Sequence, residues 1–179
     1  MQNLLLEKVE YKVDETTHGI WRRYVYPNGE YFAEFRSHAQ VFGMPFVHYT
    51  RGKCPETGRR IIAKGFIAVG RIALGVIALG QASAGIIAFG QASVALLLCL
   101  AQAGGAIVAV GQLAVGVLFG LGQVATGMTA IGQIALGGHV LAQVGFGEHL
   151  WTPERADPEA VKYFQDLWTW IASLFSKAD

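Results

Sequence analysis

A glycine repeat within a long uncharged segment constrains this chain more than any other sequence feature. Glycine recurs every five residues from Gly65 to Gly90, and the same period returns from Gly122 to Gly137. Between Ile72 and Gly147 there is no Asp, Glu, Lys or Arg. Short internal repeats are typical of chains in which each repeat packs only on its neighbours. The segment therefore predicts a repeat architecture.

A second marker, a polar residue every ten or eleven positions, overlies the glycines. Its members are Arg71, Gln81, Gln91, Gln102, Gln112, Gln123, Gln133 and Gln143. Alternate members are 20 or 21 residues apart, which predicts four coils at 65–84, 85–105, 106–126 and 127–146, each made of four five-residue sides. Two coils need one extra residue, Leu100 and Leu121, and both extras fall at the same corner.

The resemblance of units such as Gly70-Arg71-Ile72-Ala73-Leu74 to pentapeptide-repeat proteins implies that the central residue of each five points inward. The expected inward columns are Ile67/Ile87/Val108/Thr129, Ile72/Ala92/Leu113/Ile134, Ile77/Leu97/Leu118/His139 and Ala82/Ala103/Val124/Val144. The preceding residue of each five then faces outward. Two opposite sides carry glutamine ladders, Arg71/Gln91/Gln112/Gln133 and Gln81/Gln102/Gln123/Gln143. The other two sides carry apolar rows, Phe66/Ile86/Ile107/Met128 and Val76/Leu96/Val117/Gly138.

Units such as Gly70-Arg71-Ile72-Ala73-Leu74 resemble those of pentapeptide-repeat proteins, a family of quadrilateral β-solenoids. The usual Ala-Asp/Asn-Leu signature of that family is absent. The chain is also similar to an uncharacterised group of bacterial Gly-x-Ile-Ala-x-Gly repeat proteins with a Phe-Gly-x-Pro head, here Phe42-Gly43-Met44-Pro45. These resemblances imply a β-solenoid and carry no activity with them.

Charge and proline divide the chain into a head at 1–60, the repeat body at 61–147 and a tail at 148–179. In the head, Pro27-Asn28-Gly29 separates two aromatic-rich runs, which predicts a β-hairpin because Asn and Gly accept positive φ. In the tail, Asp157 and Pro158 suit the start of a helix. Its apolar face carries Phe164, Trp168, Ile171 and Phe175, which we expect to dock on the body. The predicted fold class is therefore all-β with a small N-terminal β cap and one C-terminal amphipathic helix.

Transmembrane helices are the alternative for the body, because the uncharged segment is long enough for several spans. The putative spans lack polar loops and Lys/Arg flanks between them, which argues against helices. The start of the chain lacks the basic region and apolar core of a signal peptide, so we expect a cytoplasmic protein.

The composition excludes several classes of function, but no motif identifies one. A net charge of +1 offers no excess of cations for nucleic acid, and no cofactor, metal or substrate motif is present. His139 is the one histidine in an expected inward position, and Arg59, Arg60 and Lys64 form a basic cluster before the repeat. We therefore expect a non-enzymatic structural or scaffold protein that forms homo-oligomers through Phe66, Val76, Ile86, Leu96, Ile107, Val117 and Met128. A membrane protein that uses the same uncharged segment against lipid is the alternative, and an enzyme is the third and weakest hypothesis.

Overall fold

The computed structural model describes residues 9–176 and is mostly β, with 69% strand and one C-terminal helix. The chain forms two compact units, which divide between Leu96 and Leu97. The elements are β1 (Lys12–Thr16), β2 (Gly19–Val25), β3 (Tyr31–Ser37), β4 (Gln40–Val41), β5 (Met44–Pro45), β6 (Val47–Arg51), β7 (Ala63–Val69), β8 (Ile72–Trp151) and α1 (Pro158–Ser176). The division between units lies inside β8 and inside the predicted repeat body.

The expected hairpin of the head is β2 and β3. The two strands pair antiparallel, with Tyr24 opposite Phe32, and Gly29 in the connecting turn has a φ of 81°. The sequence also predicted a further short strand at either Val41-Phe42 or Phe46-Val47-His48-Tyr49, where the structure has β4 and β6. It gave no indication of β1, which pairs antiparallel with β2 and forms the edge of the sheet. Lys12, Asp14 and Glu15 lie on β1, and charged side chains of this kind discourage strand addition at an edge.

The head continues into the repeat through one mixed sheet. Its strand order is β1-β2-β3-β6-β7-β8. The pairs are antiparallel up to β3–β6 and parallel from β6 onward. Strand β6 pairs with β7 at an offset of twenty residues, Val47 opposite Ile67, whereas β7 pairs with β8 at an offset of ten, Ala63 opposite Ala73.

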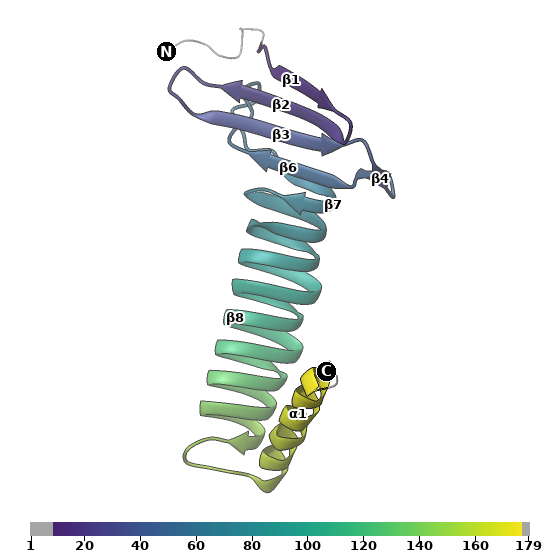
Figure 1. The fold of residues 1–179 in the computed structure, drawn as a ribbon. Coiled ribbons are helices and arrows are strands. Elements are labelled where there is room, and N and C mark those ends of the chain that lie inside the picture. The colour runs from purple at the N-terminus through teal and green to yellow at the C-terminus, as the bar shows by residue number, and fades with distance from the viewer. Residues whose placement is uncertain (1–8, 177–179) are drawn as a thin grey trace. The chain divides into compact units, whose positions relative to one another are not determined.

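The offset of ten shows that the prediction of four twenty-residue coils with four sides each is wrong. Within each unit successive turns of β8 stack on one another (Figure 1), and each turn takes ten or eleven residues. A Cβ added to Gly75 would meet the carbonyl oxygen of Gly65, one turn earlier, and a Cβ on Gly122 would meet that of Gly111. Glycine is therefore required because the backbones of adjacent turns approach too closely for a side chain.

The inward columns hold small side chains, and the expected inward residues are displaced by one position. The buried residues directly follow the predicted ones, except that Cys99 lies two positions after Leu97. They are Ala68, Ala73, Ala78, Ser83, Ala88 and Ser93 in the first unit, and Cys99, Ala109, Ala114, Ala125, Ala130, Ala135 and Val140 in the second. Leu113, Leu118, Ile134 and Val144, all expected inside, are exposed. Of the sixteen expected inward residues only Thr129 is buried.

The narrowness of a ten-residue turn explains this displacement. Two five-residue sides enclose far less space than four, so only Ala, Ser and similarly small side chains fit between them. The hydroxyl groups inside are satisfied within the coil, because Ser83 Oγ lies 2.7 Å from Ser93 Oγ and donates a hydrogen bond to the carbonyl of Phe89. The larger aliphatic side chains must therefore face outward.

The transmembrane-helix alternative for the body is also wrong, because β8 takes up the whole uncharged segment as strand. Within the described residues, no helix combines the length and the apolar character needed to cross a membrane.

The tail helix α1 starts at Pro158, as predicted. Asp157, which was expected at the start of the helix, directs its side chain toward the preceding connection. It accepts hydrogen bonds from the Leu150 backbone N–H and the Arg155 Nε–H, so it fixes the connection between β8 and α1. In the second unit the helix lies beside the last turns of β8 (Figure 1). Ala160 and Phe164 are its buried residues.

Candidate functional site

The glutamine row is exposed in both units. Arg71, Gln81 and Gln91 belong to the first unit, and Gln102, Gln112, Gln123, Gln133 and Gln143 to the second; all eight are exposed. Because a turn takes ten or eleven residues, consecutive members lie on adjacent turns. The two opposite ladders expected from the sequence are therefore wrong, and each unit carries one row.

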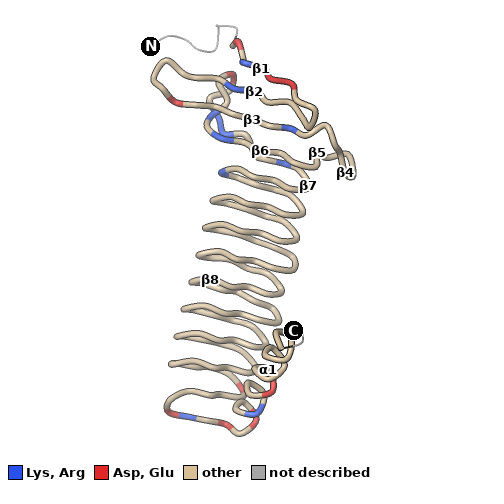
Figure 2. The backbone as a smooth tube through the Cα atoms, in the orientation of Figure 1, with Lys and Arg blue, Asp and Glu red and all other residues tan. Residues whose placement is uncertain are grey.

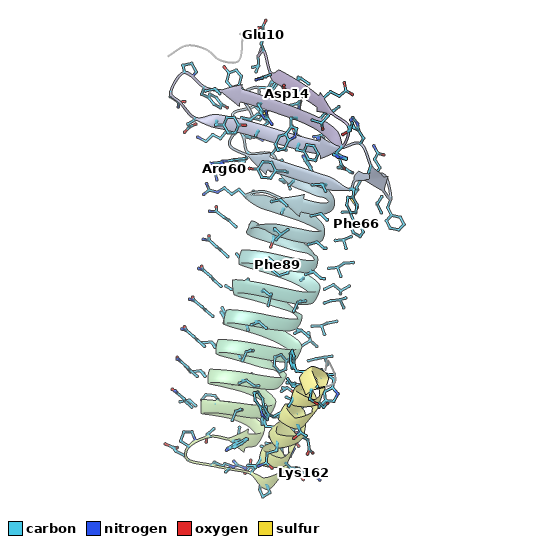
Figure 3. The ribbon with its side chains drawn as sticks, in the orientation of Figure 1. Glu10, Asp14, Arg60, Phe66, Phe89 and Lys162 are labelled. Carbon is cyan, nitrogen blue, oxygen red and sulfur yellow. The ribbon has the colours of Figure 1, made fainter. Side chains whose placement is uncertain are left out.

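The apolar row follows the same rule. Its members, which had been assigned to two opposite sides, fall at a single position of the ten-residue turn. They are Phe66, Val76, Ile86 and Leu96 in the first unit and Ile107, Val117 and Met128 in the second. Val117 and Met128 are 64% and 63% exposed, whereas Phe66, Val76 and Ile107 are half-buried. Figure 3 shows side chains standing out on opposite edges of the turns, with Phe66 on the apolar edge.

The β4–β5 hairpin extends the apolar row of the first unit. Phe46 stacks on Phe66 with ring centroids 5.6 Å apart, and Met44 lines a shallow hollow with Val76 and Ile86. Phe42 at the hairpin turn is 91% exposed and has a φ of 52°, a backbone conformation that bulky residues rarely adopt. The Phe-Gly pair was visible in the sequence, but its position beside the apolar row was not.

The second unit has a further apolar groove, between α1 and β8. It has a volume of about 770 Å³, and Phe119, Leu121, Ile131, Leu141, Trp151, Phe164, Leu167, Trp168 and Ile171 are among its lining residues. Of the four expected docking residues, Phe164 is buried and contacts Trp151 at a ring-centroid distance of 6.3 Å. Ile171 is half-buried, whereas Trp168 and Phe175 are exposed.

His139 does not lie inside the coil as expected. Its ring stacks on His149, one turn later, with centroids 4.8 Å apart, and on Tyr163 of α1 at 4.1 Å. The Tyr163 hydroxyl lies 2.6 Å from Thr129 Oγ1, and His149 Nδ1 lies 3.0 Å from Glu159 Oε2. These contacts attach α1 to successive turns of β8. Among residues 9–176 no three His, Cys, Asp or Glu side chains gather as a metal site requires.

The head contains one buried charge cluster, centred on Glu34 of β3. Arg22 and Arg36 donate hydrogen bonds to the Glu34 carboxylate. His48 Nε2 lies 3.0 Å from Glu34 Oε1. The other ring nitrogen of His48, Nδ1, accepts the Lys64 backbone N–H at 2.8 Å, so the cluster links β3, β6 and β7. Burial alone would raise the pKa of Glu34, but the hydrogen bonds from His48 and Arg22 and the arginine charges outweigh it and lower the pKa to about 2.

The lowered pKa of Glu34 predicts a specific acid sensitivity. A carboxyl with a folded-state pKa below its ordinary value of 4.5 stabilises the fold above pH 4.5, and this contribution is lost as the pH falls toward 2. Glu34→Gln should therefore lower the free energy of unfolding by roughly 3 kcal/mol at neutral pH, and the difference from wild type should vanish near pH 2. Urea unfolding as a function of pH measures this. The exposed Glu30→Gln variant is the control, and equal effects of the two substitutions would contradict the assignment.

The basic residues of the sequence cluster do not line one common hollow. Arg60 lines a hollow with Arg51 and Arg71, whereas Lys64 lines other hollows, and Arg59 lies in none of these. Figure 2 shows that charge in the first unit gathers in the head and at the start of its turns.

A scan with protein-family models and searches of curated proteins and of solved structures gave no significant match to this chain.

Proposed function

We propose that this protein is a non-enzymatic structural or scaffold protein, with a β-solenoid body of ten-residue coils, that self-associates through its apolar row. The observation that carries the proposal is the exposure of the row in a segment that has no charged residue from Ile72 to Gly147. Contiguous exposed apolar surface of this kind marks an interaction site.

A second copy of the chain is the partner that this row fits. Adjacent strands lie about 4.8 Å apart, so the row presents an aliphatic side chain at each strand spacing. A second row with the same spacing matches it position by position, as in an isologous interface where the same patch contacts itself. The adjacent apolar hairpin with Phe42 and Met44 enlarges the contact surface of the first unit.

The proposal is tested by placing a charge on the row. Val117→Lys and Met128→Lys should shift the protein from an oligomer to the monomer, because a buried unpaired ammonium opposes association. The molar mass is measured by light scattering after size-exclusion chromatography across a range of concentrations. Gln112→Lys is the matched control, because it adds the same charge at another exposed position of the same unit.

Circular dichroism separates loss of association from loss of folding. Both row variants should keep the wild-type strand signal, because both side chains are largely exposed. A wild-type protein that is monomeric at every concentration would contradict the proposal, as would an oligomer that Val117→Lys and Met128→Lys leave intact.

A membrane surface is the second candidate partner, supported by the exposed aromatic residues of α1. Trp168, Trp170 and Phe175 are all exposed on this amphipathic helix, and aromatic side chains of this kind prefer the membrane interface. Co-sedimentation with phosphatidylcholine vesicles tests this candidate. Substitution of both tryptophans by serine should abolish the binding, and failure of the wild-type protein to sediment with vesicles would exclude it.

A further inference from the structure

Three arginines in the first unit line one hollow without an acidic neighbour. Arg51, Arg60 and Arg71 surround it together with Thr50, Gly52, Ile61 and Gln81, and its volume is about 290 Å³. Arg51 ends β6, Arg60 precedes β7, and Arg71 lies between β7 and β8. Figure 3 shows Arg60 projecting from the connection beside the first turns.

The fold places two of these arginines around the same hollow. The β6–β7 pairs run at an offset of twenty residues as far as Tyr49 opposite Val69. Arg51 comes two residues after Tyr49 and Arg71 two residues after Val69, so both follow the paired segment, and both line the same hollow. Like charges that share a hollow repel each other, and an anion between them offsets this repulsion.

Among the described residues, three arginines of the head, Arg22, Arg23 and Arg36, have acidic partners, whereas Arg51, Arg60 and Arg71 do not, and neither does the neighbouring Arg59. Arg22 and Arg36 pair with Glu34, and Arg23 pairs with Asp14 at 2.9 Å. The ion pairs between described residues include neither Arg51, Arg60 nor Arg71.

Arg71 also departs from its own row. The later members of that row are all glutamine, and Gln81 lines the hollow beside the one arginine of the row. A neutral amide would satisfy the exposed site equally well if solvent were its only neighbour.

We propose that Arg51, Arg60 and Arg71 form a binding site for a phosphate group. The guanidinium group carries paired donors that match two phosphate oxygens, and three such groups around one hollow supply both charge and orientation. The Gln81 amide adds a neutral donor. The hollow, of about 290 Å³, lies at the small end of the range of ligand sites, and a single phosphate group is the smallest ligand that three guanidinium groups bind.

Inorganic phosphate is the probe for the site in solution. Calorimetric titration of the full-length protein at low ionic strength should show phosphate binding that Arg71→Gln and Arg60→Gln each weaken about tenfold or more. Arg71→Gln places the usual row residue at position 71, so the fold should be retained, and Arg60→Gln lies outside the strands. Arg59→Gln is the matched control, because it removes the same charge next to the site and should change the affinity less than about twofold.

A vesicle experiment distinguishes free phosphate from a lipid headgroup. Vesicles of phosphatidylcholine with phosphatidic acid present a phosphate monoester, and pure phosphatidylcholine vesicles are the control. Binding to the phosphatidic acid vesicles that Arg71→Gln removes, without binding of inorganic phosphate, identifies the lipid as the source. The proposal is overturned if neither probe binds, or if Arg59→Gln weakens binding as much as Arg71→Gln and Arg60→Gln.

Discussion

Replacing Ala130 with leucine is expected to lower the free energy of unfolding of the second unit by about 3 kcal/mol or more. Ala130 is fully buried in an inward column, where it packs with Ala125, Ala135 and Val140. The turns on either side are fixed by backbone pairing, so they cannot move apart to admit three further carbon atoms. Urea unfolding followed by circular dichroism gives the free energy.

Comparison with Leu118→Ala tests which side chains of the turn point inward. Leu118 is 51% exposed, so truncating it should cost less than about 1 kcal/mol. A coil with large aliphatic side chains inside would give the opposite order, because removal of a buried leucine costs about 2–5 kcal/mol. A larger loss for Leu118→Ala than for Ala130→Leu would therefore reject the ten-residue turn.

Phe164→Ala is expected to release α1 from β8, with a loss of about 3–5 kcal/mol from the free energy that holds the helix in place. Phe164 is buried and contacts both Trp151 and Tyr163. Its removal leaves a space that the neighbouring turn cannot fill. Hydrogen exchange of the α1 amides measures the local opening, which should accelerate by two or more orders of magnitude.

Phe175→Ala provides a control with the same residue type on the same helix. Phe175 is 78% exposed, so its truncation should change the stability by less than about 0.5 kcal/mol. If Phe175→Ala abolishes membrane binding or self-association without changing amide exchange, the exposed end of α1 takes part in that interaction. Equal acceleration of exchange in both variants would contradict the observed docking of α1.

The association predictions address a separate property from these stability predictions. Val117→Lys alters a side chain that already faces solvent, whereas Ala130→Leu alters one that is enclosed. A scaffold that relies on its apolar row should lose assembly with the first change and folding with the second. The two outcomes therefore distinguish the outer surface of the coil from its interior.

Local chemistry was sufficient to predict several elements from the sequence. Asn28-Gly29 marks the β2–β3 turn because both residues accept positive φ, and Pro158 suits the first position of α1. Each of these features depends on residues close together in the chain, so no knowledge of distant partners was needed.

The five-residue glycine period predicted a repeat architecture from the sequence alone, but it left the number of sides per turn open. Two five-residue sides and four five-residue sides produce the same sequence pattern. Only the tertiary structure shows the turn length, because Ala63 pairs with Ala73 and one turn therefore takes ten residues. A turn of this length encloses an interior that admits only small side chains. The same pairing puts both expected glutamine ladders at one position of the turn, and both apolar rows at another. The fold also places Arg51 and Arg71 around one hollow. The physical reason is that backbone pairing between distant residues sets the turn length, and turn length sets the space available for side chains.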